Sequence, residues 1–322
     1  MKRFAWLLAA ALVLPVSAAW AQAYPTKPVT MIVPFAAGGP TDVVARIVGE
    51  SMSRTLGQQI VVENVAGAGG TTGISRGAAA APDGYTIMMG HMGTHGAAPA
   101  LYPNIRYNPT TDFEPIGMAA GTPILIVSRK DFPAADLRSF VAAVKAGGDK
   151  LNQAHAGVGS VSHTTCTMFN VQIGTKPTLV PYTGTGPVLN DMIAGKVDYV
   201  CDQIVNLVEQ IKAGSIKAYA IATPKRSPAL PDVPTTIEAG MPEYQVSAWN
   251  ALFAPKGTPK AIVDKLNDAL SKALDDPNAR KRLLDLGGVL PEGDERTGAW
   301  LGKFVAEEVD RWGKTIRAAN AR

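Results

Sequence analysis

The sequence predicts an α/β protein of two domains, in which helices cover mostly parallel sheets. Short apolar runs of strand length alternate with amphipathic stretches of helix length along most of the 322 residues. A succession of strand–helix–strand units favours a parallel sheet with helices on both faces. About 300 residues remain once the export signal described below is removed, and a chain of that size is expected to form two domains.

The first block contains two strand–helix units followed by a strand. The apolar run over residues 29–34 predicts a strand. Residues 42–56 predict a helix, because Val44 and Val48 fall on one apolar face. The rest of the block comprises a β-branched strand over residues 59–65, a helix of small residues over 71–81 and a strand over 85–89.

The middle of the chain repeats this alternation. Gly195 and Gly214 stand where helices favour a left-handed C-terminal residue, so they mark two helix ends. The expected helices cover residues 137–146, 162–173, 187–194 and 204–213, and the expected strands cover 151–156, 178–181, 197–201 and 216–222.

Two extended segments flank the middle block, residues 116–127 before it and 218–224 after it. We interpret them as crossover strands that join two mixed sheets, each flanked by helices. The middle block is then a domain inserted into the first one. The expected domains are residues 24–122 together with 223–322, and residues 123–222 for the inserted domain.

The C-terminal part returns to the first domain. A Pro-rich stretch over residues 227–244 lacks periodicity and predicts a connecting loop. In the last helix Trp300, Phe304 and Trp312 recur at helical spacing, which we interpret as packing against the first domain rather than as a ligand-binding box. The elements expected after the loop are a strand over residues 246–254 and helices over 259–274, 279–286 and 296–319.

The N-terminus has the order of a secretory signal peptide. Lys2 and Arg3 precede an apolar run over residues 4–16, and small residues then offer cleavage near Ala21 or Ala23. An uncleaved anchor is the alternative, but the run is shorter than the roughly 20 apolar residues that a spanning helix needs. Residues 1–23 are therefore expected to be removed from an exported, soluble protein.

Charge and cysteine content bound the possible partners. Removal of Lys2 and Arg3 lowers the basic count from 31 to 29 against 27 acidic residues, a net charge of +2. Because these charges are scattered and no basic cluster alternates with aromatic residues, nucleic acid is a poor candidate partner. Cys166 and Cys201 could form a disulfide in an oxidising compartment, but the length of the chain favours two buried thiols.

Five loops at predicted strand ends are rich in Gly, Ser and Thr and contain neither Lys nor Arg. Glycine lets backbone approach a ligand closely, and free N–H groups at helix N-termini attract anions. One such loop alone is more often an ordinary turn, with Thr41, Thr71 or Ser162 capping a helix. Five together favour a cleft for a carboxylate at the carboxyl ends of the strands. They cover residues 34–42, 66–73, 90–96, 157–164 and 182–187.

Enzyme and metal motifs are incomplete. Ser160 lies outside a G-x-S-x-G elbow, and a pair of Ser160 with His163 would lack a third, orienting group. Neither Gly-rich loop of the first block runs into the Gly-Lys-Ser/Thr of a P-loop. His91 and His95 lie four residues apart, but in a segment expected to be loop and without a neighbouring carboxylate. We therefore expect no enzyme activity, no cofactor and no metal.

Several separate motifs, in the same order, resemble those of the Bug family, the extracytoplasmic solute receptors of tripartite tricarboxylate transporters. The resemblance runs from Tyr24 to the C-terminus. The motifs are Tyr24-Pro25, Val33-Pro34-Phe35 with Gly38-Gly39, Val62-Glu63-Asn64, Pro82-Asp83-Gly84-Tyr85-Thr86, Pro181-Tyr182-Thr183-Gly184 and Ala254-Pro255-Lys256-Gly257-Thr258-Pro259.

This resemblance implies a two-lobed periplasmic binding protein of type II-like architecture, a monomer that closes on a small carboxylate. It also implies a ligand that is often a dicarboxylate or an amino acid, two bound waters that bridge one ligand carboxylate to the first domain, and delivery to a permease of two integral-membrane subunits. By position, the first-domain wall of the cleft would contain Phe35, Ala36, Gly38, Gly67, Gly70, Thr71 and His91. The opposing wall would contain Ser160, Ser162, His163, Thr164, Tyr182, Thr183 and Asp202.

Three positions carry finer expectations. Asp42 is assigned to the start of a helix rather than to ligand contact. Asp202 either accepts a hydrogen bond from a ligand ammonium or hydroxyl group or caps the following helix. Thr183 stands where the family usually has Lys, which makes the cleft less cationic and favours a ligand with one tightly held carboxylate. A receptor that presents its ligand to a membrane sensor remains an alternative to one that feeds a permease.

Overall fold

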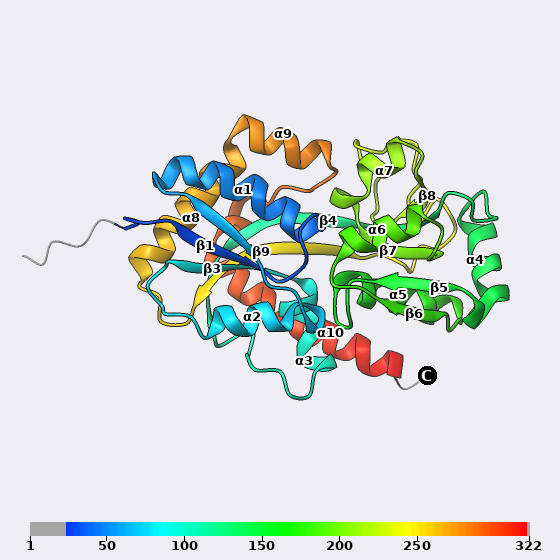
Figure 1. Cartoon of the computed structure of the whole chain (residues 1–322), viewed down its shortest axis with the longest axis horizontal. Coiled ribbons are helices and arrows are strands. Elements are labelled where there is room, and N and C mark those ends of the chain that lie inside the picture. Colours follow the sequence, from blue (N-terminus) through cyan, green and yellow to red (C-terminus); the bar gives the residue numbers. More distant parts are fainter. Residues whose placement is uncertain (1–23, 321–322) are drawn as a thin grey trace, which may run out of the picture.

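Two mixed sheets that share one long strand form the framework of the protein, seen in a computed structural model that describes residues 24–320 (Figure 1). The predicted signal peptide, residues 1–23, lies outside the described residues. The shared strand is β4 (Phe113–Arg129). Its first half pairs antiparallel with β9 (Ser247–Pro255), and its second half with β7 (Tyr199–Gln203) and β8 (Ile216–Ile221).

The first lobe follows the predicted order of elements closely. β1 (Val29–Val33) pairs in parallel with β2 (Ile60–Asn64) and β3 (Thr86–His91), and β3 pairs antiparallel with β9. Its helices are α1 (Pro40–Leu56), α2 (Thr71–Ala78), α8 (Lys260–Asp275), α9 (Pro277–Asp285) and α10 (Gly298–Asn320).

The second lobe repeats this plan at the far end of β4. β5 (Asn152–His155) pairs in parallel with β6 (Thr178–Pro181) and with β7. Its helices are α4 (Leu137–Gly147), α5 (Val161–Ile173), α6 (Thr185–Ile193) and the short α7 (Val208–Lys212). The parallel strands of both lobes direct their carboxyl ends toward the middle of the molecule.

Three local predictions were wrong. Residues 92–97, expected to be loop, form a π-helical turn followed by α3 (Ala98–Leu101), because the His91 side chain caps it. The single helix expected over 204–213 is divided into a 3₁₀ turn (Ile204–Asn206) and α7. Residues 218–224 were expected to cross between lobes, but β8 ends at Ile221 and it is β9 that runs beside β4 in the first sheet.

The preference for two free thiols was also wrong. Cys166 on α5 and Cys201 on β7 form a disulfide, with their Cα atoms 5.0 Å apart. The Thr165 hydroxyl donates to the Cys201 carbonyl at 2.8 Å. The helix and the strand that approach the middle of the molecule from the second lobe are therefore fastened together.

The hydrophobic core runs along both faces of the joined sheets. One cluster packs under α1, α8 and α6, with Val48, Leu270 and Val188 fully buried. The other packs under α10, α5 and α4 and includes Trp312, fully packed as predicted for the aromatic residues of the last helix. Residues of both lobes contribute to each cluster, so the core is continuous along β4 and β9.

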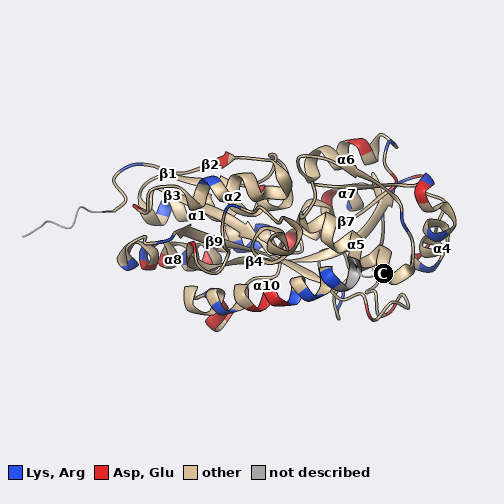
Figure 2. Ribbon diagram, turned by 90° about the horizontal axis from the view of Figure 1, so that it is seen from below, with Lys and Arg blue, Asp and Glu red and all other residues tan. Residues whose placement is uncertain are grey.

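Charged residues are distributed over the outer helices. Figure 2 shows Lys and Arg interspersed with Asp and Glu on α8, α10 and α4 rather than gathered on one face. Within residues 24–320, no helix has the length and apolar character needed to cross a membrane.

Candidate ligand-binding cleft

A small cavity lies between the two lobes, at the carboxyl ends of their parallel strands. Its volume is about 10 Å³, close to what one ordered water requires, so the lobes are nearly closed on each other. Open α/β sheets bind ligands at this edge. The lining residues come from both lobes: Phe35, Gly39, Pro40, Thr41 and His91 from the first, and Ala156, Ser160, Val161, Ser162, Thr185, Asp202 and Gln203 from the second.

Three helices begin at this cavity. α1 begins after Gly39, α5 after Ser160 and α6 after Gly184. The first N–H groups of a helix have no partner within it, and the helix dipole adds partial positive charge there. Of the residues that the structure describes, no Lys or Arg lines this cavity. An anion held here would be bound by backbone N–H and hydroxyl groups.

Asp42 holds the loop before α1 in shape. Its carboxylate accepts hydrogen bonds from the Gly38 N–H at 3.0 Å, from Arg46 Nε at 2.9 Å and from Asn64 Nδ2 at 2.9 Å. Burial would raise the pKa of Asp42, but these hydrogen bonds lower it below its ordinary value. The acid lies in the first turn of α1, as expected, and its oxygens are occupied by protein donors.

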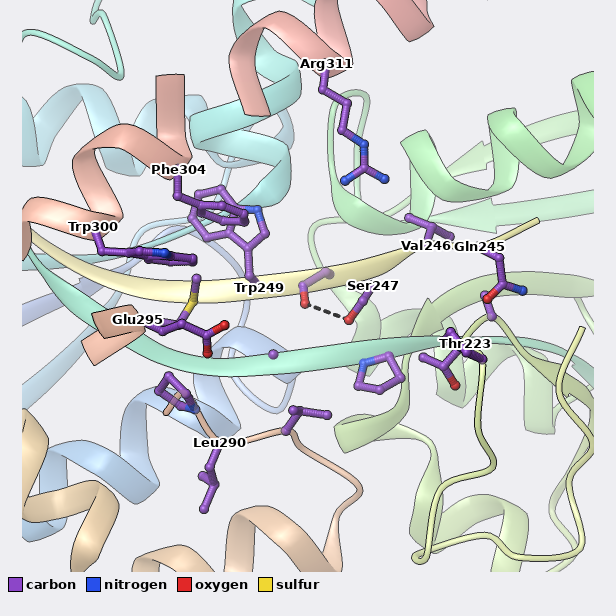
Figure 3. A pocket seen from close by; sticks show the side chains of 18 residues that line it. Thr223, Gln245, Val246, Ser247, Trp249, Leu290, Glu295, Trp300, Phe304 and Arg311 are labelled. Atoms are coloured by element: carbon purple, nitrogen blue, oxygen red, sulfur yellow. Dashed lines mark hydrogen bonds between the residues drawn. The ribbon is translucent and has the colours of Figure 1, made fainter. Parts of the chain in front are cut away.

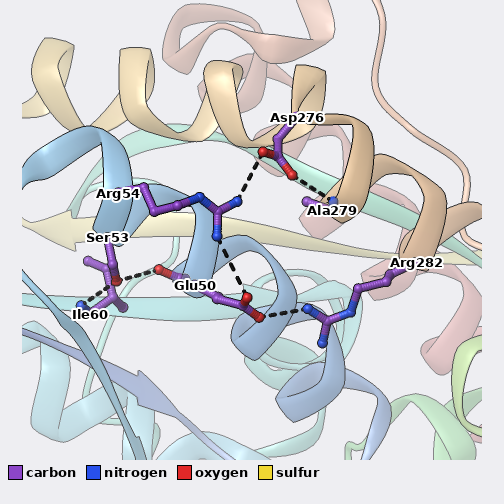
Figure 4. A network of polar contacts seen from close by, with 8 residues as sticks. Glu50, Ser53, Arg54, Ile60, Asp276, Ala279 and Arg282 are labelled. Atoms are coloured by element: carbon purple, nitrogen blue, oxygen red, sulfur yellow. Dashed lines mark hydrogen bonds and ion pairs between the residues drawn. The ribbon is translucent and has the colours of Figure 1, made fainter.

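The other end of α1 is tied to α9 and the turn before it by a network of charges (Figure 4). Arg54 pairs with Asp276 at 3.0 Å and with Glu50 at 3.6 Å, and Glu50 also pairs with Arg282 at 2.7 Å. Each exposed pair contributes little, about 0–1 kcal/mol, but a network restricts several side chains at once. It joins the C-terminal half of α1 to α9 and to the turn before α9.

His91 ends β3 and faces the cavity as a neutral imidazole. Its Nδ1 accepts from the N–H groups of Gly93 at 2.7 Å and Thr94 at 3.3 Å. Burial lowers its pKa to about 3, so the ring is uncharged at neutral pH. Because Nδ1 is an acceptor, the ring proton is on Nε2, which is a hydrogen-bond donor. The ring of Phe35 stacks on His91 with centroids 4.8 Å apart.

The loop before α5 is shaped by two further histidines. His155 Nδ1 accepts from the Gly157 N–H at 3.1 Å, and His163 Nδ1 accepts from the Gly159 N–H at 3.3 Å. Burial and, to a smaller extent, the neighbouring His155 lower the pKa of His163 to about 4. Its ring therefore holds the backbone, and the described structure contains no hydrogen bond from this ring to the Ser160 hydroxyl that a hydrolase would need.

Ser160 and Ser162 serve the backbone as well as the cavity. Ser160 caps α5 by accepting the His163 N–H at 3.2 Å, so it is the capping residue in place of the predicted Ser162. Ser162 Oγ accepts the Ala156 N–H at 3.0 Å and lies 3.3 Å from Ser160 Oγ. One of the two hydroxyls donates to the other in this contact, so one O–H of the pair remains for the cavity.

Asp202 is the one carboxylate among the residues lining the cavity. Oδ2 accepts from the Thr185 hydroxyl at 2.5 Å and Oδ1 from the Gln203 N–H at 2.8 Å. Burial raises the pKa of Asp202 to about 6, although these hydrogen bonds oppose the change. Asp202 does not cap the 3₁₀ turn that follows, which has no side-chain cap. It instead braces the start of α6.

The lobes touch through the glycine-rich loops. The Ala36 N–H donates to the Thr183 carbonyl at 3.3 Å, and the Tyr102 hydroxyl donates to the Val158 carbonyl. Gly69 has a φ of +61°, and a Cβ atom built on it would lie 1.7 Å from the Val158 oxygen. Only glycine permits this approach, so the contact between lobes depends on the absence of a side chain there.

The predicted site residues divide into two groups. Phe35, His91, Ser160, Ser162 and Asp202 line the cavity. The others surround it without lining it: Ala36, Gly38, Gly67, Gly70, Thr71, His163, Thr164, Tyr182 and Thr183. Among them, the Tyr182 hydroxyl donates to Asp191 at 2.8 Å, and the Thr183 side chain is exposed.

Prediction from sequence missed seven of the lining residues: Gly39, Pro40, Thr41, Ala156, Val161, Thr185 and Gln203. Thr41 and Thr185 lay inside two of the five loops and could have been included as residues of helix N-termini. Gln203 had no local signal, because it is an ordinary last residue of a strand.

A larger cavity of about 500 Å³ lies behind the crossover strands, away from the cleft (Figure 3). Its walls come from β4, β9, α10 and the segments around Thr223 and Leu290. Trp300 stacks on Phe304 with centroids 4.7 Å apart, and Trp249 meets Phe304 edge to face at 5.3 Å. Trp300 and Phe304, predicted to pack against the first domain, contact it through Trp249 and also border this cavity.

Comparison with known proteins places this geometry in a family. The family model described as tripartite tricarboxylate transporter family receptor matches residues 44–321. MatC (Rpa3494) from Rhodopseudomonas palustris, solved with bound malate, is 50% identical, with 91% of this chain and 100% of that chain covered and a TM-score of 0.89.

Two other solved structures are similar. The periplasmic binding protein BugD is 44% identical, with coverage of 92% and 99% and a TM-score of 0.90. Rpa4515 of R. palustris, solved with adipate, is 32% identical, with coverage of 92% and 98% and a TM-score of 0.87. The predicted fold class, that of a periplasmic binding protein, is confirmed by these matches.

Proposed function

This chain belongs to the tripartite tricarboxylate transporter receptor family, and we propose that it captures a small dicarboxylate between its lobes and delivers it to a membrane permease. The family is one of solute-binding receptors. The proposal includes export to the periplasm, a monomeric receptor, hinged closure of the domains and no turnover of the ligand.

The observation that carries the proposal is the meeting of three helix N-termini at one interlobe cavity without a lining cation. Such a site favours an anion small enough for both lobes to reach it. Backbone N–H and hydroxyl donors at fixed positions can bind both oxygens of a carboxylate without a lining cation. MatC holds malate and Rpa4515 holds adipate, which supports dicarboxylates as the ligand class.

The cavity volume supports closure as part of binding. A space of about 10 Å³ cannot admit a dicarboxylate, so the lobes must open for entry and close again. Residues Gly69 and Val158 from opposite lobes would separate during opening, while β4 and β9 remain continuous.

The binding claim is tested by thermal shift and calorimetry on residues 24–322, unfolded and refolded to remove retained ligand. The panel contains dicarboxylates of three to eight carbons, with neutral and cationic solutes of similar size as controls. A saturable stabilisation of about 2.7 kcal/mol is expected at a hundredfold excess over Kd. Absence of any shift with every carboxylate would overturn the proposal.

Delivery is tested separately, by uptake of the identified dicarboxylate in cells that lack the receptor or the two permease subunits. Loss of uptake in both strains is the expected result, and the plasmid-borne receptor should restore uptake only in the strain that lacks the receptor. Normal uptake without the receptor, together with loss of a ligand-dependent transcriptional response, would instead assign the protein to a membrane sensor.

A further inference from the structure

Two polar side chains stand together at the end of β7, on the second-lobe side of the cavity. Asp202 and Gln203 are 1% and 2% exposed, and both line the cavity. β7 ends here, beside Ile124 of β4, where the strand crosses between the lobes. The pair therefore lies at the floor of the cleft, beside the crossover strands.

The Gln203 side chain is held by both crossover strands. Its Oε1 accepts from the Thr122 hydroxyl at 2.6 Å and from Asn250 Nδ2 at 3.1 Å. Thr122 belongs to β4 and Asn250 to β9, and both are fully buried. Asn250 Nδ2 also lies 3.3 Å from Thr122 Oγ1, which closes a buried triangle of hydrogen bonds. Two donors thus occupy the two lone pairs of one amide oxygen.

The neighbouring carboxylate decides which way the amide faces. With Oε1 on Thr122 and Asn250, the Gln203 amino group lies on the side of Asp202, where it lowers the pKa that burial raises. The reversed amide would set its oxygen against a carboxylate and its amino group against the donor of Asn250. One N–H of this amino group is directed to Asp202, which leaves the other for the cavity that both residues line.

We propose that Asp202 and Gln203 form a donor–acceptor pair that recognises a hydroxyl group on the ligand, so the preferred class is the 2-hydroxy dicarboxylates. This inference rests on the proposed function and adds a specificity determinant to it. A carboxylate offers only acceptors and would be repelled by Asp202. An ammonium group offers only donors and would leave the Gln203 amide unpaired. A hydroxyl group both donates and accepts, so it satisfies the two side chains together.

Thr122 and Asn250 act through Gln203 and are positioning residues. The Thr122 hydroxyl donates the shortest hydrogen bond of the buried triangle, and without it the amide could rotate or reverse. Asn250 Oδ1 is buried and has no hydrogen-bond partner in the described structure. Replacement of Asn250 would also disturb its pairing with His91 in the sheet, so Thr122 is the cleaner site for a test.

The test compares malate with succinate, which has the same four-carbon chain and two carboxylates but no hydroxyl group. Aspartate, with an ammonium group at the same carbon, is the third probe. Titration calorimetry of the refolded protein is expected to show malate bound about 10- to 100-fold more tightly than succinate, the range for one hydrogen bond to a charged group. Gln203→Met, which keeps the side-chain length, should reduce the ratio to within about threefold of one.

Thr122→Val should also reduce this preference, and Thr122→Ser should restore it, because serine keeps the donor. Gln245→Met is the matched control, since Gln245 lines the cavity behind the crossover strands. Its malate-to-succinate ratio should equal that of the unmodified protein. Circular dichroism and thermal unfolding confirm that each variant is folded, and the comparison of Thr122→Val with Thr122→Ser provides the measurement if Gln203→Met does not fold.

The outcomes separate the two proposals. Binding of both malate and succinate with equal affinity would overturn hydroxyl recognition and leave the dicarboxylate receptor intact. Tighter binding of aspartate than of malate would assign Asp202 to an ammonium group and overturn the role of Gln203. Failure to bind any of the three, or any longer dicarboxylate, would overturn the proposed function itself.

Discussion

The two sides of the crossover strands are built in opposite ways. In front, the cleft is a polar cavity of about 10 Å³ at which three helices begin. Behind, a cavity of about 500 Å³ is bordered by Trp249, Trp300 and Phe304. The rear cavity is much the larger of these two, yet the helix N-termini lie at the front one. We attribute the small volume of the front cavity to the proposed closure of the lobes on each other.

The comparison shows that the binding side is marked by the helix N-termini that meet there and not by the volume of its cavity. Helix N-termini face the front because every parallel strand of both lobes ends there. The rear is covered by α10, whose buried Glu308 accepts from Trp249 Nε1 at 2.9 Å and from Trp312 Nε1 at 3.1 Å. We therefore expect substitutions in front to alter binding and substitutions behind to alter stability.

The largest expected effect on ligand binding is that of Gly69→Ala. The added methyl group would overlap the Val158 oxygen of the other lobe and prevent closure, so dicarboxylate affinity should fall about 1,000-fold. Gly174→Ala is the control, because Gly174 has a similar φ of +71° but no atom within 4 Å of the added Cβ. Both variants carry the same backbone strain, and calorimetry distinguishes them. Equal affinities would contradict the closure contact.

A pH titration sharpens the comparison through Asp202. Burial raises its pKa from 3.8 to about 6, so the folded protein holds this proton more tightly than the unfolded chain. Stability is therefore favoured below about pH 4 and decreases as the pH rises toward 6, by about 3 kcal/mol in total. Urea unfolding of wild-type and Asp202→Asn at pH 4 to 7 measures this contribution. The difference in unfolding free energy between the two proteins should change by about 3 kcal/mol over that range. A difference in unfolding free energy that does not vary with pH would contradict the raised pKa of Asp202.

The rear is tested by Trp249→Phe. This change removes one of the donors to buried Glu308 and keeps an aromatic ring against Phe304. Unfolding free energy should fall by about 1–2 kcal/mol, while dicarboxylate affinity stays within about threefold. Trp300→Phe, which keeps a ring stacked on Phe304, should change stability by less than about 0.5 kcal/mol. A large loss of affinity in Trp249→Phe would show that the two sides are not separable.

The smallest effect is expected at Thr183, which borders the front without lining its cavity. Thr183→Lys adds a cation to an exposed position in the contact between lobes, where its charge is screened by water. We expect a shift of about two- to fivefold in relative affinity across a carboxylate panel, toward ligands with a second free carboxylate. An unchanged order of affinities at low salt would remove Thr183 from the determinants of specificity.

Much of the fold and part of the cleft could be predicted from the sequence. The alternation of strands and helices gave the α/β class because periodicity is a local property. Gly-rich loops at strand ends predicted where the cavity lies, and Phe35, His91, Ser160, Ser162 and Asp202 line it. Tyr182 does not line this cavity, and its hydroxyl donates to Asp191, because a motif gives the position of a side chain and not its direction.

The sequence by itself determined the order of elements, the anion-favouring composition of the loops and the absence of cations from them. Only the tertiary structure decided the disulfide of Cys166 with Cys201 and the hydrogen bonds that orient Gln203. Gln203 lies 81 residues from Thr122 and 47 from Asn250. Contacts at such separations depend on how the two sheets join along β4 and β9. The local periodicity of the sequence does not predict how they join.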